Sequence, residues 1–168
     1  MIDWLLIPYY RIRRWLIKRG FIRALEAERI EAKFAEEFLE KLLNIMSLLF
    51  IIEPNFRKHI KDFFGTIEFR SKDYEIRVLA TFKDNKLKIR ELKPEEKLED
   101  APNAVIIFKN PIALMNFLLP KGGRRDILRS ILNNEVVLQG NLNYIYRFSF
   151  IANHLQLALM KRSRLTFE

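Results

Sequence analysis

The 168-residue sequence contains no cysteine and only two histidines, His59 and His154. Without cysteine the chain can form neither a disulfide nor a thiolate metal site. The two histidines lie far apart in the chain and do not have the spacing typical of a zinc site. Because disulfides form in oxidising compartments, the absence of cysteine fits a reducing cytosol. We therefore expect a cytoplasmic protein with no bound metal and no other cofactor.

Long apolar runs are also absent. The longest apolar stretch, Leu42 to Ile52, is interrupted by Asn44 and Ser47. A membrane-spanning helix needs roughly 20 apolar residues, so this stretch is too short to cross a bilayer. The amino terminus is unlike a signal peptide, because its positive charges follow its apolar residues and it lacks a small-residue cleavage site. Any membrane association is therefore expected to be peripheral, on the inner face of the membrane.

No arrangement of residues typical of an active site is present. The serines lack a GxSxG setting, and neither histidine stands in a triad pattern. The acidic residues fall on charged helix faces or in loops, where solvation explains them. The segment 121–124, Lys-Gly-Gly-Arg, is too short for a phosphate-binding P-loop. It reads either as a basic loop between helices or as a contact for lipid head groups. We expect that the protein is not an enzyme.

Positive charge and phenylalanine are abundant. The formal net charge is +9, and the chain has 14 Phe within a hydrophobic content of 49%. With 30% charged residues, this balance is that of a folded domain. Basic residues concentrate in residues 1–20 and 101–168, which suits phospholipid head groups or nucleic acid. Because no nucleic-acid-binding motif is present, the charge favours an anionic membrane surface as the partner.

The chain divides at Gly20 into a basic, aromatic segment, residues 1–20, and a main domain, residues 21–168. The first segment predicts an amphipathic helix whose apolar stripe consists of Leu5, Tyr9, Ile12 and Leu16. The predicted membrane-contact residues are Trp4, Arg11, Arg14, Trp15, Lys18 and Arg19. Tryptophan prefers the head-group layer and basic side chains are attracted to anionic lipid, so such a helix can lie in the interface. The alternative is a helix that docks on the main domain with a solvated basic face.

The hydrophobic period of the main domain predicts helices at its two ends and strands between them. Helices are expected over residues 22–50, 55–63, 111–119, 126–132 and 142 to about 160. Strands are expected over 66–70, 74–82, 87–91, 104–108 and 136–138. The first three strands alternate apolar and polar residues, which predicts an antiparallel meander with one wet face. The wholly apolar segment 104–108 predicts a strand buried on both faces. The fold class is α+β, with about five mostly antiparallel strands covered by helices on one side.

Three segments of this domain resemble the sterol-carrier-protein-type-2 domain family. They are the apolar strand Ala104–Phe108, the helix Pro111–Leu119, whose start is marked by an Asn-Pro cap, and the stretch Leu132–Leu142. The last stretch is similar to the family's GxLxxxGDxxxAxxL pattern. Asn134 stands where the family usually has Gly, and Asn141 where it usually has Asp. Asparagine tolerates the left-handed backbone that glycine often supplies, so the turn can survive.

The resemblance covers about residues 30–160, including an opening strand at 64–69. It implies an SCP2-like domain whose helices and sheet enclose an apolar cavity for a fatty acyl, sterol-like or isoprenoid lipid. A looser similarity extends to bacterial accessory members of the family that serve ubiquinone biosynthesis. On this resemblance we expect non-enzymatic binding or carrying of an apolar lipid near a membrane. The alternative is a protein-interaction or assembly module of a lipid or quinone pathway that has lost its ligand.

Apolar side chains after residue 100 would line this cavity. They are Phe108, Leu114, Met115, Phe117, Leu118, Ile131, Leu138, Phe148 and Ile151. Lipid pockets are lined by apolar side chains with few polar anchors, and methionine lends such a lining adaptability. Plain hydrophobic core is the alternative for each of these residues. The partners expected from this interpretation are an apolar lipid, an anionic membrane surface and proteins of lipid or quinone metabolism.

Overall fold

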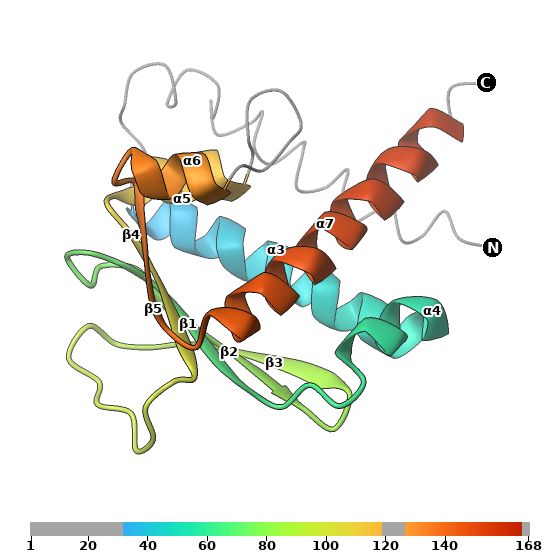
Figure 1. Ribbon diagram of the computed structural model, residues 1–168, viewed down its shortest axis with the longest axis horizontal. Helices are drawn as coiled ribbons and strands as arrows, with labels where there is room; N and C mark the ends of the chain where they lie inside the picture. The colour runs from blue at the N-terminus through green and yellow to red at the C-terminus, as the bar shows by residue number, and fades with distance from the viewer. Residues whose placement is uncertain (1–31, 119–126, 166–168) are drawn as a thin grey trace.

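The computed structural model describes residues 32–118 and 127–165. The predicted helix of residues 1–20, the start of the main domain up to residue 31 and the basic loop 121–125 lie outside these residues. In chain order the described elements are α3 (Ala32–Ile52), α4 (Pro54–Arg57), the 3-10 turn η2 (Lys58–Ile60), β1 (Gly65–Ser71), β2 (Arg77–Lys83), β3 (Lys86–Glu91), β4 (Ala104–Phe108), α5 (Pro111–Leu118), α6 (Ile127–Leu132), β5 (Val136–Gly140) and α7 (Leu142–Leu165) (Figure 1). All five predicted strands are present, and β4 has the predicted bounds.

Helix α3 presents one apolar face to the interior, as its sequence period predicts. In the sequence, Ile30, Phe34, Phe38, Leu42, Ile45 and Leu49 recur at three- and four-residue steps, which predicts one apolar stripe. Of these, Phe34, Phe38, Ile45 and Leu49 are buried. The helix ends at Ile52, two residues before Pro54, because a proline disfavours the helical conformation at the residue that precedes it. The described part of the predicted helix therefore forms as expected and contributes a wall of aromatic and aliphatic side chains to the core.

The short helix predicted over 55–63 forms as two pieces, α4 and η2. Arg57, the last residue of α4, donates from Nε to the carbonyl oxygen of Phe50 at 2.5 Å and from Nη2 to the carbonyl oxygen of Ile51. These two carbonyls belong to the last turn of α3, where the backbone acceptors have no partner within the helix. Arg57 therefore caps α3 and fixes the direction in which the chain leaves it.

The five strands form one sheet in the order β3-β2-β1-β4-β5. Strands β1, β2 and β3 make the predicted antiparallel meander, and β5 is antiparallel to β4. Strand β4 instead pairs in parallel with β1, so that Phe69 lies opposite Val78 on one side and Ile106 on the other. The sheet is mostly antiparallel, as predicted, with one parallel pair at its centre.

Helices α3, α5 and α7 pack on the same face of the sheet. The ring pairs that join helix to strand are Phe50–Phe82 (6.5 Å between centroids), Phe69–Phe148 (5.0 Å) and Phe108–Phe117 (5.4 Å). The strand register places Phe69, Phe82 and Phe108 on one face, so the three helices must share that face. In Figure 1, α7 crosses the front of the molecule and α3 lies behind it. The apolar layer between these helices and the sheet is the core of the domain.

Strand β4 departs from the prediction on the other face of the sheet. Ala104, Ile106 and Phe108 are buried, but Val105 and Ile107 are only half-buried. The prediction of a strand buried on both faces is therefore wrong. An unbroken apolar run is typical of a strand covered on both sides, whereas here the helices cover one side only.

The face opposite the helices contains a buried ion pair. Glu68 of β1 and Arg77 of β2 are 3% and 6% exposed, and Arg77 Nε lies 2.9 Å from Glu68 Oε1. Arg77 Nη1 also donates to the carbonyl oxygens of Lys93, Pro94 and Glu96 at 2.9, 3.2 and 2.8 Å. The segment that follows β3 is thereby held over the pair and covers this part of the sheet.

Candidate functional site

Seven of the nine predicted lining residues are buried in the apolar layer. These seven are Phe108, Leu114, Met115, Phe117, Leu118, Phe148 and Ile151. Leu138 is half-buried and packs against the same cluster, and Ile131 of α6 is half-buried. The fold thus brings side chains from β4, α5, β5 and α7 into one apolar layer. An enclosed cavity at this place stays a prediction, and so does the lining role of each residue.

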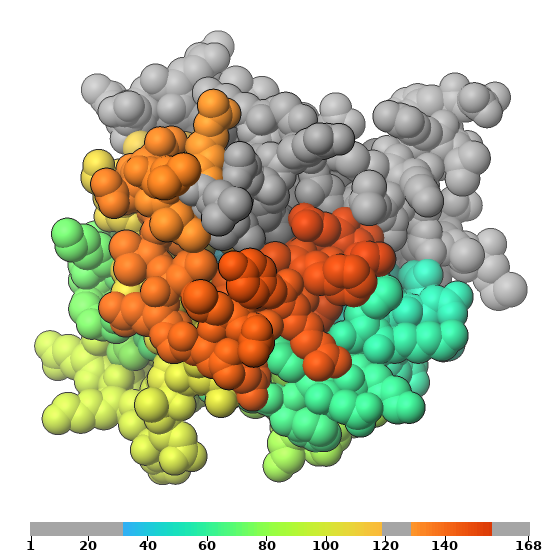
Figure 2. Space-filling view, in the orientation of Figure 1, coloured from blue at the N-terminus to red at the C-terminus, as the bar shows by residue number. Residues whose placement is uncertain are grey.

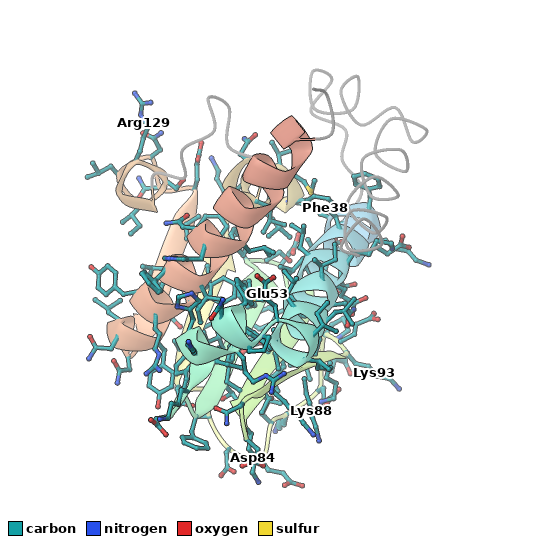
Figure 3. The ribbon with its side chains drawn as sticks, turned by 90° about the vertical axis from the view of Figure 1, so that its right-hand side faces the viewer. Phe38, Glu53, Asp84, Lys88, Lys93 and Arg129 are labelled. Atoms are coloured by element: carbon teal, nitrogen blue, oxygen red, sulfur yellow. The ribbon has the colours of Figure 1, made fainter. Side chains whose placement is uncertain are left out.

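Aromatic side chains from the first half of the domain contribute to the same layer. Phe38, Phe69 and Phe82 are almost completely buried, and Figure 3 shows Phe38 projecting from α3 toward the space between α3 and α7. The prediction missed them as lining residues because it rested on the segments after residue 100. The signal was present in the sequence, since Phe38 lies on the apolar stripe of its helix and Phe69 alternates with polar neighbours.

Among the described residues, the buried polar ones, Glu68, Ser71 and Arg77, all make hydrogen bonds, whereas two further buried polar atoms, Arg70 Nε and Ser149 Oγ, have no hydrogen-bond partner. Glu68 and Arg77 pair with one another on the opposite face. Ser71, at the end of β1, donates from Oγ to the carboxylate of Asp73 and accepts the N–H of Ile76 at 3.0 Å. The described part of the apolar layer therefore offers a ligand dispersion and hydrophobic contacts.

Asn103 ties the first strand to the junction between β5 and α7. Its Oδ1 accepts the N–H of Thr66 at 2.7 Å, and its carbonyl oxygen accepts the N–H of Asn141 at 2.8 Å. Gly140 has φ +83°, and a Cβ there would lie 2.5 Å from the carbonyl oxygen of Asn103. Both the left-handed backbone and this close approach require glycine. The contact sets where α7 starts and so where Phe148 enters the apolar layer.

The two asparagines at which the resemblance is imperfect, Asn134 and Asn141, adopt conformations that suit a turn and a helix cap. Asn134 has φ 55°, which confirms that it adopts the left-handed conformation expected of the glycine it replaces. Asn141 accepts the N–H of Asn143 at Oδ1 at 3.0 Å, as a helix cap does. The predicted cap of α5 is also present, since Asn110 Oδ1 accepts the N–H of Ala113 at 2.8 Å.

Two histidines meet beside α7. The ring centroids of His59 in η2 and His154 in α7 are 4.5 Å apart. The ring of Phe150 lies 5.3 Å from that of His59 and 4.2 Å from that of His154. Burial lowers the pKa of His59, and the proximity of His154 lowers it further. His154 is half-buried. The pair is far apart in the chain, so only the fold reveals it.

One solved structure decides the architecture. UbiJ-SCP2, described as a ubiquinone synthesis protein, superimposes with a TM-score of 0.53 at 13% sequence identity, covering 74% of this chain and 93% of that chain. The fold is SCP2-like. At this identity the likeness establishes the fold alone. It confirms the predicted α+β class and the expectation drawn from the segments around β4, α5 and β5.

Other solved structures are more distant from this SCP2-like domain. Sterol carrier protein domain 2 of Helicoverpa armigera has a TM-score of 0.46 at 11% identity, covering 68% of this chain and 84% of that chain. The inverting sec-alkylsulfatase Pisa1 from Pseudomonas sp. has a TM-score of 0.45 at 13% identity, covering 67% of this chain and 15% of that chain. At these TM-scores neither supports an argument. Neither protein-family models nor curated proteins match the sequence.

The predicted membrane-contact residues all lie in residues 1–20, outside the described part of the SCP2-like domain. Within the described ranges, none of the helices combines the length and the apolar character that spanning a bilayer requires. The membrane role of residues 1–20 therefore stays a prediction.

Proposed function

We propose that this protein binds a long apolar lipid in the layer between the sheet and helices α3, α5 and α7, and carries it next to a membrane without altering it chemically. The observation that supports this most is the convergence of the predicted lining. Side chains chosen from the sequence alone come from four separate elements and meet in one apolar layer of an SCP2-like fold. The ligand classes that suit such a layer are fatty acyl, sterol-like and isoprenoid quinone chains.

In this proposal the affinity comes from apolar burial. A lipid chain loses its contact with water when it enters the layer, at a gain of about 25 cal/mol for each Å² of apolar surface removed from water. The side chains there already contact one another, so the ligand must displace contacts such as the Phe108–Phe117 ring pair. Binding is then the difference between these two sets of contacts, and no proton transfer or bond cleavage is involved.

One observation favours a second candidate, a protein-interaction or assembly module without a ligand. The rings of the apolar layer pack at centroid distances of 5.0 and 5.4 Å, as they do in an ordinary core. UbiJ-SCP2 is described as a ubiquinone synthesis protein, which suggests quinone synthesis as the pathway for either candidate. We propose that pathway for this chain on the strength of the fold likeness.

Native mass spectrometry of the purified protein, with solvent extraction of any bound lipid, tests the proposal. The expected result is a co-purifying lipid, or saturable binding of a fluorescent fatty acid or quinone analogue by the delipidated protein. Absence of a lipid together with no binding of either probe would contradict the carrier function and leave the interaction module.

A further inference from the structure

The outer side of α7 exposes large apolar side chains. Leu142, Tyr146 and Phe150 are 44%, 63% and 50% exposed. They recur every four residues and therefore lie along one side of the helix. The inward side is buried through Phe148 and Ile151, so α7 is apolar on both sides. Figure 2 shows α7, in orange and red, on the face of the molecule toward the viewer.

The surroundings of this stripe are cationic. No acidic residue occurs in the sequence between Glu135 and Glu168, and α7 includes Arg147 next to Tyr146. Arg147 Nη2 donates to the carbonyl oxygen of Lys61 at 2.5 Å, which places the basic segment 57–61 beside the helix. Lys58 and Lys61 of that segment are exposed, and Asp62 is the exposed acid next to them.

We propose that this α7 face, formed by Leu142, Tyr146 and Phe150 with the neighbouring Lys58 and Lys61, docks on an anionic phospholipid bilayer. The apolar side chains would enter the head-group boundary, where tyrosine is favoured, while Lys58 and Lys61 contact lipid phosphates. The inference goes beyond the proposed function, because it needs no bound ligand and assigns membrane contact to residues other than 1–20.

Charge complementarity favours an anionic bilayer over a second copy of the chain or a nucleic acid as the binding partner of this face. Two copies placed stripe against stripe would bring Lys58 and Lys61 of one copy against those of the other, with few acids to pair them. A nucleic acid offers negative charge, but it would leave the apolar stripe without an apolar partner. An anionic bilayer satisfies both parts of the face.

Flotation of the full-length protein with vesicles of phosphatidylglycerol and phosphatidylcholine tests the inference. The double variant Tyr146→Gln/Phe150→Gln is expected to partition onto the vesicles about tenfold more weakly than the wild type, because it removes most of the apolar area of the face. Glutamine is a good helix former, so α7 should persist. The matched control is Leu132→Gln, which removes a side chain that is 81% exposed on α6, and it should float like the wild type. Because Phe150 contacts His59, Leu142→Gln/Tyr146→Gln serves as a second variant that leaves this contact intact.

A tryptophan fluorescence reporter distinguishes membrane contact by the α7 face from the membrane contact predicted for residues 1–20. In full-length protein carrying Trp4→Phe and Trp15→Phe, the substitution Phe150→Trp places the only tryptophan on α7. Its emission should shift to the blue on addition of anionic vesicles, and not on addition of neutral ones. Equal flotation of wild type and both glutamine variants would overturn the inference, and so would an unshifted reporter on floated protein. A dimer or a DNA complex that the variants abolish, without vesicle binding, would also overturn it. Lipid copurification, measured on the same variants, reports separately on the proposed function.

Discussion

Glu68 and Arg77 form an ion pair across the first two strands, with 2.9 Å between Oε1 and Nε, on the face of the sheet that the helices do not cover. The register places Leu79 opposite Glu68 and Arg70 opposite Arg77, so the two partners are diagonal neighbours on one face. Because the guanidinium of Arg77 also binds three carbonyls of the following loop, the pair connects the sheet to the connection between β3 and β4.

Glu68→Gln is expected to lower the free energy of unfolding by about 3 kcal/mol, since it leaves the buried Arg77 cation without its counter-ion. Urea unfolding followed by circular dichroism measures this. The double variant Glu68→Gln/Arg77→Gln should lose less than the sum of the two single losses, because neither charge then stays buried alone. In Arg77→Gln, trypsin should cut faster after Lys97, because the segment that contains it has lost the Arg77 donor to the carbonyls of Lys93, Pro94 and Glu96. Strictly additive losses would contradict the coupling.

Gly140→Ala is expected to destabilise the domain by about 3 kcal/mol, the size of effect typical of a strained backbone combined with a steric clash. The added Cβ would meet the carbonyl oxygen of Asn103, which accepts the first N–H of the β5–α7 junction. Thermal unfolding of the variant measures the loss. Gln139→Ala, at the exposed neighbouring position, is the control and should change stability little. A Gly140→Ala protein as stable as wild type would show that the junction relaxes freely.

Stability should fall as the pH is lowered, in part through His59. The pKa of His59 is lowered in the folded protein by burial and by His154, so the unfolded chain binds this proton more readily. The contribution of neutral His59 to the free energy of unfolding is therefore fully present above the unfolded pKa of about 6.5, and it is lost as the pH falls through the folded pKa. Thermal midpoints of His59→Gln between neutral and acid pH should fall less steeply than those of the wild type.

The pKa shifts of two acidic residues change the stability with pH in the direction opposite to that of His59. The effect of His59 must therefore be measured against a matched variant that keeps these acids. Burial raises the pKa of Glu36 and of Glu40, and the nearby Glu91 raises both further. Their folded forms hold protons more tightly, so their contribution favours the folded state at low pH and is lost as the pH rises. Lys58→Gln, beside His59, removes a neighbouring charge without removing a histidine and should follow the wild-type curve. Parallel curves for His59→Gln and wild type would contradict the assignment.

Phe117→Asp is expected to abolish binding of a fluorescent fatty acid or quinone analogue, because an unpaired charge in an apolar layer is very costly. Circular dichroism must show that the variant is folded, and Leu132→Asp at an exposed site of α6 is the control. Phe117→Ala gives a milder test, since it deletes the ring that contacts Phe108 without adding charge. Normal affinity in folded forms of both Phe117 variants would remove this residue from the site.

Deletion of residues 1–20 is expected to weaken flotation with anionic vesicles and to remove part of its salt dependence. Attraction of Arg11 and Lys18 to head groups is screened over about 10 Å at 0.1 M salt, whereas anchoring by Trp4 and Trp15 depends less on salt. Equal flotation of the full-length and shortened proteins would show that this segment is only a structural brace. Salt-sensitive binding to DNA or RNA in place of vesicles would instead favour a nucleic-acid role.

Local patterns predicted most of the elements and part of the candidate site. The helical stripe through Phe34 and Phe38, the alternation around Phe69 and the Asn110 cap are each readable within a few residues, because burial repeats with the period of the element. Phe108 and Phe148 were named as lining residues on the family resemblance and not on such a period, since the strand of Phe108 is wholly apolar and gives local patterns nothing to separate its two faces. Local patterns could not show whether those side chains surround a ligand or one another, because both arrangements require the same apolar residues at the same positions.

What the sequence determined by itself was the order and type of the elements from α3 onward, and the apolar face of α3 and of the first strands, since these depend on neighbours along the chain. The tertiary structure decided which elements meet. The parallel pairing of β1 with β4, the burial of Glu68 and Arg77 beneath a loop, and the contact of His59 with His154 all join residues distant in sequence. Such contacts leave no periodic signal, because their partners are chosen by the packing of the whole domain rather than by the local chain.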